Sequence, residues 1–231
     1  MKKGPPFAAV VFDCDSTLTS VEGIDELGRR AGFGRDIQAL TTEAMEGRIP
    51  LEDIYAKRLE QIRPSKTAVR LLGNLYVSRM VPGAGSTIAT LKRINKKVFI
   101  ASGGIREAVE MLAAQLDVPG SDVYAVELKH DEHGQYLGYK RSPLTKSSGK
   151  VDICTKIAKK YGPTVLIGDG MTDLAVSKAG IEFVGFGGVI QRPMIKEKAK
   201  AYVPGPTISP LLKIILTEEE IAENAAILSK K

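Results

Sequence analysis

Short apolar runs alternate with longer stretches of helical spacing along this chain. Three of the runs lie at residues 7–12, 98–101 and 164–167, and each is followed at once by polar or glycine residues. Runs of this length between turn-forming residues are typical of strands that are buried on both faces, as in a parallel sheet. A further run at residues 183–186 has the same character. Their alternation with helical segments predicts an α/β fold whose core is a Rossmann-like, doubly wound and mostly parallel sheet.

The stretch between residues 21 and 80 has helical spacing and no strand-like run. Apolar residues recur in it every three or four positions, first at Ile24, Leu27 and Ala31, and again after Pro50. Such spacing places apolar side chains on one face of a helix. We therefore expect a small all-helical cap domain inserted into the α/β core. The predicted parts are a discontinuous core at 1–20 and 81–217, the cap at 21–80, and a helical C-terminal tail at 218–231.

Chemically reactive side chains follow the first three runs. Asp13 and Asp15 end the first run, Ser102 follows the second, and Asp169 follows the third. Ligand sites in open α/β sheets lie outside the carboxyl ends of the strands, so we expect these side chains to meet. The two glycines after Ser102 would let backbone N–H groups approach an anion. Together with Lys150, which opens another helical pattern, this set could bind both a metal ion and a phosphate group.

Each of these residues also has a plainer interpretation. The paired acids could be solvated at the end of a strand, Ser102 could cap a helix that begins near Arg106, and Asp169 could occupy a turn between two glycines. Lys150 is one of 33 Lys and Arg residues, and most such residues are surface charges. The arrangement of the whole set at successive strand ends favours the functional interpretation.

The same motifs resemble those of the haloacid dehalogenase superfamily of aspartate-nucleophile phosphatases, in the same order and over almost the whole chain. The matching positions are residues 13–17, Ser102 with Gly103, Lys150, and residues 168–170 with Asp173. Within the superfamily, residues 13–27, 44–47 and 102–104 resemble the phosphoserine phosphatase family. The resemblance implies a magnesium-dependent phosphomonoesterase that hydrolyses O-phospho-L-serine to L-serine and phosphate, the last step of serine biosynthesis.

The resemblance also assigns the catalytic roles. Asp13 is the expected nucleophile, which would form an aspartyl-phosphate and so split one difficult displacement into two easier ones. Asp15 would act as general acid and then as general base. Mg²⁺ prefers oxygen ligands, and Asp13, Asp169 and the backbone carbonyl of Asp15 are the expected ones. Asp173, expected one helical turn past Asp169 on the same helical face, would orient the metal shell or Lys150.

The remaining expected contacts are with the substrate. The phosphate contacts are Ser102, Gly103, Gly104 and Lys150. Glu22 and Arg58 in the cap match the positions that hold the ammonium and carboxylate groups of phosphoserine, and a guanidinium suits a carboxylate. Other matching positions are Met45, Thr172 and Arg192, with Leu51 as part of an apolar wall. Without the resemblance, Glu22 is a favourable acid in a first helical turn, and Arg58 is a solvated partner of nearby acids such as Glu60.

Other functions are compatible with the same residues. A phosphotransferase would pass the phosphoryl group from phosphoserine to another alcohol, using the same aspartyl-phosphate. A phosphatase for another small phosphomonoester would need the same catalytic groups. A phospho-ligand binding module is the non-enzymatic alternative, and the full set of catalytic carboxylates argues against it.

The composition of the chain limits the classes of partner and the location that we expect. The net charge is +6, but the basic residues are scattered among acids and aromatic residues make up only 6%, so we expect no nucleic-acid partner. The basic start of the chain lacks the apolar core of a signal peptide, and no apolar run is long enough to cross a membrane, so a cytoplasmic location is the default expectation. Cys14 and Cys154 are too few for a disulfide framework.

Three smaller features leave alternatives open. Residues 123–128 and 135–139 could form a hairpin or a plain connecting meander. His130 and His133 lie near its turn with no third ligand close in the sequence, so we interpret them as surface histidines. In the tail, Ile221 and Leu228 lie at helical spacing with Ala225 and could dock on the core or on another subunit, which leaves a homodimer open.

Overall fold

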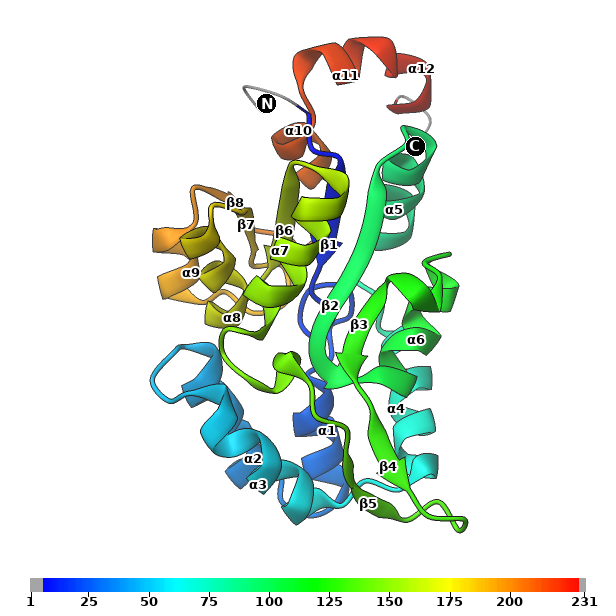
Figure 1. Cartoon of the computed structure of the whole chain (residues 1–231), viewed down its shortest axis with the longest axis vertical. Helices are drawn as coiled ribbons and strands as arrows, with labels where there is room; N and C mark the ends of the chain where they lie inside the picture. Colours follow the sequence, from blue (N-terminus) through cyan, green and yellow to red (C-terminus); the bar gives the residue numbers. More distant parts are fainter. Residues whose placement is uncertain (1–5, 229–231) are drawn as a thin grey trace.

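A six-stranded parallel sheet forms the centre of the protein in the computed structural model, which describes residues 6–228 (Figure 1). In spatial order the strands are β3 (Val123–Val126), β2 (Lys97–Ile105), β1 (Ala9–Phe12), β6 (Thr164–Gly168), β7 (Glu182–Phe186) and β8 (Ala201–Val203). Every neighbouring pair is parallel. All residues of the central strands β1 and β6 are buried, as expected for strands covered on both faces. The predicted α/β fold is confirmed.

Helices connect the strands and flank the sheet. The connecting helices of the core are α5 (Ala84–Arg93), α6 (Arg106–Gln115), α7 (Gly149–Tyr161), α8 (Met171–Leu174) and α9 (Pro193–Lys198), with short 3-10 helices at Gly120–Asp122, Pro143–Thr145 and Ala175–Ala179. The chain passes from β1 to β2 on one side and later returns to β6 on the other side of β1. This change of direction opens a crevice at the carboxyl ends of β1, β2 and β6, which is where ligands bind in sheets of this kind.

Four helices lie between β1 and α5, and we call residues 21–80 the helical insertion. They are α1 (Gly23–Arg30), α2 (Gly34–Met45), α3 (Leu51–Ile62) and α4 (Lys66–Ser78). Figure 1 shows α1, α2 and α3 beyond the carboxyl ends of the central strands, while α4 runs beside α6. The two connections to the core lie side by side, because Ser20 N donates to the Arg79 carbonyl and Val81 N donates to the Leu18 carbonyl. The helical insertion therefore stands over the crevice.

The segment after α6 differs from the predicted hairpin. Val123–Val126 joins the edge of the main sheet as β3, and only β4 (Leu128–His130) and β5 (Tyr136–Tyr139) form the antiparallel pair. Val123 and Val126 are both buried, so the first four residues of the predicted strand gain more from packing on β2 than from extending the hairpin. The strand β8 at the opposite edge has only three residues and is not anticipated from the sequence.

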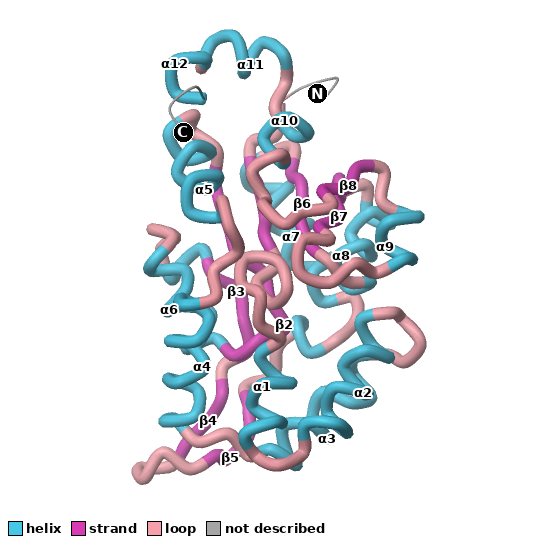
Figure 2. Tube along the Cα trace, turned by 180° about the vertical axis from the view of Figure 1, so that it is seen from behind, coloured by secondary structure: helices cyan, strands magenta, loops and turns pink. Residues whose placement is uncertain are grey.

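The C-terminal part folds back beside the core. It contains α10 (Leu211–Ile215), α11 (Glu218–Glu223) and α12 (Ala225–Leu228), and the last residues of the predicted tail lie outside the described chain. Figures 1 and 2 both show α12 next to α5, and Ile221 and Leu228 pack against the hydrophobic core. Glu220 forms an ion pair with Lys96. Within residues 6–228, we find no helix with the length and apolar character needed to span a lipid bilayer.

Candidate active site

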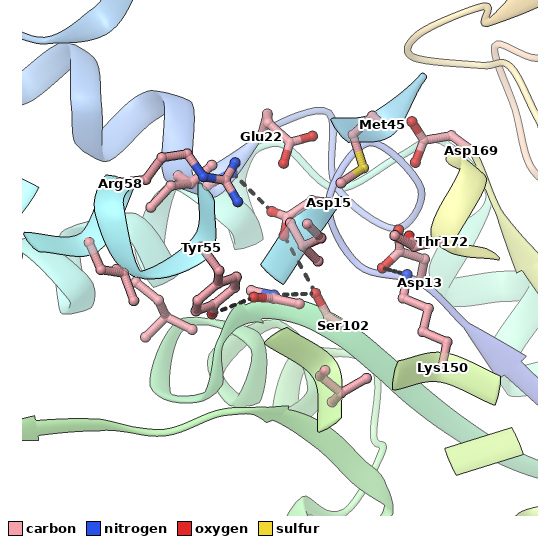
Figure 3. A pocket seen from close by; sticks show the side chains of 18 of the residues that line it. Asp13, Asp15, Glu22, Met45, Tyr55, Arg58, Ser102, Lys150, Asp169 and Thr172 are labelled. Atoms are coloured by element: carbon pink, nitrogen blue, oxygen red, sulfur yellow. Dashed lines mark hydrogen bonds and ion pairs between the residues drawn. The ribbon is translucent and has the colours of Figure 1, made fainter. Parts of the chain in front are cut away.

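A pocket lies between the carboxyl ends of the central strands and the helical insertion (Figure 3). Most of the residues predicted from the sequence line this pocket: Asp13, Asp15, Glu22, Met45, Leu51, Arg58, Ser102, Gly103, Gly104, Lys150, Asp169 and Thr172. Asp173 and Arg192 do not line it and contact lining residues instead. Folding thus brings together side chains from three strand ends, two core helices and the helical insertion.

The loop after β1 separates the two acids that follow the strand. Ser16 has a positive φ of 54°, and the N–H groups of Thr17 and Leu18 donate to the Cys14 carbonyl at 3.2 and 2.8 Å. This tight turn sends the Asp13 carboxylate toward Lys150 and the Asp15 carboxylate toward the helical insertion. The two carboxylates therefore face different parts of the pocket, which suits two different chemical roles.

Lys150 connects two buried carboxylates. Its Nζ lies 2.7 Å from Oδ1 of Asp13 and 2.5 Å from Oδ1 of Asp173. Asp173 also accepts the Gly170 N–H with Oδ2, at 3.0 Å. The helix α8 begins at Met171, so Asp169 precedes the helix and the predicted shared helical face is wrong; Asp173 instead folds back over the helix N-terminus. Each oxygen of Asp173 thus accepts one hydrogen bond, Oδ1 from Lys150 and Oδ2 from the backbone.

Asp169 is held by two donors. Thr17 Oγ1 donates to Oδ1 at 3.4 Å, and Arg192 Nε donates to Oδ2 at 3.0 Å. The side chains of Asp169 and Arg192 are both almost fully buried. The sequence predicts Arg192 as a substrate contact, but in this structure its guanidinium partly neutralises Asp169 and lies off the pocket wall.

Three carboxylates gather closely enough to hold a cation. Asp13, Asp169 and Asp173 each offer an oxygen, and these oxygens lie within 4.8 Å of one another. Burial raises the pKa of Asp13 well above its usual range, and Asp173 adds to this while Lys150 opposes it. Burial also raises the pKa of Asp169 to about 6, against the opposing effect of Arg192. Three buried acids with two basic partners leave negative charge uncompensated, so the cluster fits a hard divalent cation such as Mg²⁺.

The predicted metal ligand Asp15 contributes differently from the other two. Its carboxylate accepts the Gly23 N–H at 3.0 Å and lies outside the three-acid cluster. The Asp15 carboxylate is therefore separate from the group of acids that could hold a cation.

Ser102 and the glycines after it form a small polar surface at the end of β2. The strand does not stop before them as the sequence suggests, but continues with a register shift to Ile105. Ser102 Oγ accepts the Gly104 N–H at 2.9 Å, and α6 has no side-chain cap, so the interpretation of Ser102 as a helix cap is wrong. Its hydroxyl is turned toward the pocket and lies 3.5 Å from Oδ2 of Asp15.

The wall formed by the helical insertion carries one partly buried acid, Glu22, and one buried guanidinium, that of Arg58. Burial raises the pKa of Glu22 well above its usual range, and Asp15 adds to this. Arg58 is 3% exposed; its Nη1 donates to Thr41 Oγ1 at 2.8 Å, and its Nε has no hydrogen-bond partner among the described residues. Arg58 does not have the solvated position that its plainer interpretation implies, whereas Glu22 directly precedes the first residue of α1. Figure 3 shows both on the same side of the pocket.

Two tyrosines of the pocket are not predicted as functional from the sequence. Tyr55 on α3 donates its hydroxyl hydrogen to the Gly103 carbonyl at 2.8 Å, which ties the helical insertion to the end of β2. Tyr76 on α4 donates to Oδ1 of Asp15. The helical periodicity after Pro50 includes Tyr55, but no signal in the sequence shows which polar atom either hydroxyl reaches.

Comparison with known proteins gives a consistent result. Residues 7–180 match a family of hydrolases described as haloacid dehalogenase-like. The phosphoserine phosphatase of Mus musculus is 36% identical over 198 residues, which cover 84% of this chain and 88% of that protein. The phosphoserine phosphatase of Methanocaldococcus jannaschii is 31% identical over 215 residues, 89% of this chain and 96% of that protein. A solved complex described as substrate-bound phosphoserine phosphatase is 28% identical, with a TM-score of 0.80, and covers 92% of this chain and 100% of that one.

Proposed function

Because this chain belongs to the haloacid dehalogenase-like hydrolase family and, within it, to the phosphoserine phosphatases, we propose that it hydrolyses O-phospho-L-serine to L-serine and phosphate. The observation that carries the choice of substrate is the placement of Glu22 and Arg58 in the same pocket as Asp13. The proposal includes Mg²⁺ dependence, an aspartyl-phosphate intermediate and a place as the last step of serine biosynthesis.

A zwitterionic amino acid complements this wall of the pocket. The unpaired Nε of Arg58 is a buried donor, which costs free energy until an acceptor such as a substrate carboxylate binds it. Burial and the neighbouring acids raise the pKa of Glu22, and a substrate ammonium group beside it would favour its ionised form. Met45 and Leu51 line the same pocket and offer apolar contacts to the short aliphatic part of the substrate.

The first step would transfer the phosphoryl group to Asp13. A carboxylate oxygen of Asp13 attacks phosphorus, the bond from phosphorus to the serine oxygen breaks, and Asp15 gives its proton to the departing oxygen. Ser102 and the amides near it, together with Lys150, hold the phosphate oxygens and offset their charge. A magnesium ion bound by Asp13, Asp169 and the Asp15 carbonyl would reduce the repulsion between the nucleophile and the phosphate.

The second step would release the phosphate. Asp15, now ionised, takes a proton from a water molecule whose oxygen attacks phosphorus. The bond between phosphorus and Asp13 breaks, which regenerates both carboxyl groups in their starting states. Closure of the helical insertion over the pocket would restrict the nucleophile to one water and exclude other acceptors.

A panel of phosphomonoesters tests the proposal. Phosphate release should be fastest from O-phospho-L-serine, Asp13→Asn should abolish it, and rapid acid quench followed by mass spectrometry should find one phosphoryl group on the peptide that contains Asp13. Arg58→Ala and Glu22→Gln should raise KM for phosphoserine about tenfold or more, while an aryl phosphate without an amino-acid group is turned over as before. Equal losses on both substrates would contradict the assignment of an amino-acid substrate.

The same panel separates hydrolysis from transfer. With an alcohol such as glycerol present, a phosphotransferase would give phosphorylated alcohol in place of free phosphate, whereas the proposed phosphatase gives free phosphate throughout.

A further inference from the structure

We propose that Tyr76 is a positioning residue for Asp15, which holds one carboxylate oxygen in place so that the other faces the phosphate. This inference rests on the proposed role of Asp15 as general acid and base. Tyr76 lies on α4 and is completely buried. Its hydroxyl donates to Oδ1 of Asp15, a residue 61 positions earlier in the chain.

Two donors occupy the same oxygen of Asp15. Besides the Tyr76 hydroxyl, the backbone N–H of Gly23, the first residue of α1, donates to Oδ1 at 3.0 Å. The other oxygen, Oδ2, points to the end of β2, where it lies 3.5 Å from Ser102 Oγ. A carboxyl oxygen that already accepts two hydrogen bonds is a poor place for a proton, because the added hydrogen would face two donors. The transferred proton is therefore carried on Oδ2.

Gly23 makes room for this contact. A Cβ atom added at position 23 would overlap the Tyr76 hydroxyl and would lie 3.2 Å from Oδ1 of Asp15. The conformation of Gly23 does not itself require glycine, because its φ is not positive. The missing side chain is explained by the space that the phenol needs to reach Asp15.

Oδ2 of Asp15 lies beside the same polar surface that we expect to hold the phosphate oxygens. A Cβ atom added at Gly104 would lie only 2.7 Å from Oδ2, so this oxygen is directly against the backbone that the phosphate approaches. Partial rotation of the Asp15 carboxyl group about its last bond would break the hydrogen bonds from Tyr76 and Gly23 and would turn Oδ2 away from the end of β2. Both donors belong to the helical insertion, whereas Asp15 belongs to the core, so the correct orientation depends on how the helical insertion is seated.

The leaving group provides a test that a general structural defect would not satisfy. Release of an alkoxide requires a proton from Asp15, whereas p-nitrophenolate leaves without one. We expect Tyr76→Phe to lower kcat/KM for O-phospho-L-serine about tenfold, as for a lost hydrogen bond to a charged group, and to lower kcat/KM for p-nitrophenyl phosphate less than about threefold. Tyr136→Phe, which removes the hydroxyl of another buried tyrosine outside the pocket, is the matched control and should change neither value.

A second variant should remove the hydrogen bond from Tyr76 to Asp15 without a change at Tyr76 itself. Gly23→Ala leaves the phenol in the protein but pushes it from Asp15, so it should reproduce the preference for the aryl substrate. Thermal unfolding of each variant shows whether it is folded at the assay temperature. Equal falls in kcat/KM for both substrates, or no fall in either variant, would overturn the proposal. If the wild type turns over other alkyl phosphates but not phosphoserine, the proposed substrate is wrong, and the comparison on those alkyl phosphates still decides the role of Tyr76.

Discussion

Arg58 and Thr41 meet inside the helical insertion, where Nη1 of the guanidinium donates to Oγ1 of the threonine at 2.8 Å. Thr41 in turn donates to Oδ1 of Asp25 at 2.5 Å. These contacts join α3, α2 and α1 and fix the direction in which the guanidinium enters the pocket. Arg58 also lies with its guanidinium carbon 5.9 Å from the centre of the Tyr55 ring.

Removal of the Thr41 hydroxyl should weaken substrate binding. Thr41→Val keeps the shape of the side chain but leaves Arg58 without its anchor, so we expect KM for phosphoserine to rise roughly threefold to tenfold with little change in kcat. Thr42→Val is the control, because Thr42 is only partly buried on the same helix and its hydroxyl donates to the Gln38 carbonyl instead of supporting Arg58. Steady-state kinetics with phosphoserine measures both effects, and an unchanged KM in Thr41→Val would show that Arg58 needs no anchor.

Loss of the Lys150 charge should affect both activity and stability. Lys150→Met leaves Asp13 and Asp173 buried without their cation, so we expect kcat/KM to fall about 10²- to 10³-fold and the unfolding free energy to fall by about 3–5 kcal/mol. Lys156→Met, at an exposed position of the same helix, should change neither quantity.

The stability defect of Lys150→Met should depend on pH. Burial raises the pKa of Asp13 in the folded state above its unfolded value, and loss of Lys150 removes a group that opposes this. A group with a raised pKa keeps its stabilising contribution below the unfolded pKa and loses it as the pH rises through the folded pKa. Urea unfolding at about pH 5 and about pH 8 should therefore find the variant closer to the wild type at the lower pH. A larger deficit at the lower pH would contradict this account.

Magnesium should stabilise the folded protein directly. A ligand that binds only the folded state raises the unfolding temperature by mass action, and the cluster of Asp13, Asp169 and Asp173 exists only when the chain is folded. We expect addition of Mg²⁺ to raise the melting temperature of the wild type and to have no effect on Asp169→Asn. Asp152→Asn changes an exposed acid and should keep the wild-type response. Chelation followed by calorimetry makes the comparison without any activity assay.

The two cysteines should be inert in the folded protein. Cys14 and Cys154 are both completely buried, and burial raises the pKa of the Cys154 thiol to about 12 and that of the Cys14 thiol well above its usual range. The thiolate is the reactive form, so alkylation by iodoacetamide should stay slow under native conditions and become rapid in denaturant. Mass spectrometry measures the labelling; rapid modification of either thiol without unfolding would contradict the burial.

Because the pKa of the Cys154 thiol is raised on folding, we expect the free energy of unfolding to fall at high pH. The pKa of Cys154 is raised on folding, so its contribution is present below the usual thiol pKa of about 9 and is lost between there and about 12. Cys154→Ala should therefore show a shallower decline of the unfolding free energy over this range than the wild type shows.

Much of the site could be predicted because its residues are adjacent in sequence to the strands that carry them. A run of buried residues ends at Asp13, another leads to Ser102, and a third leads to Asp169, and parallel strands bring their carboxyl ends to one edge. The helical spacing of the helical insertion likewise depends only on neighbours three or four positions apart. Local pattern and general rules of sheet topology were enough for these features.

Other relationships depend on atoms that are far apart in the sequence. The pattern around Tyr76 does not indicate that its hydroxyl reaches Asp15, and the pattern around Arg192 does not indicate that it pairs with Asp169. The sequence leaves residues 123–128 open as part of a hairpin or of a connecting meander, because packing of β3 on β2 is invisible in the local pattern.

The amino-acid sequence by itself therefore determined the fold class, the order of the strand ends and the acids, hydroxyl and lysine that they present, because hydrophobic burial and chain direction are local properties. Only the tertiary structure decided which oxygen of each carboxylate is occupied and by which donor, because a hydrogen bond requires its partners to meet within about 3 Å. That choice distinguishes Asp13, which faces Lys150, from Asp15, which faces Tyr76 and Gly23.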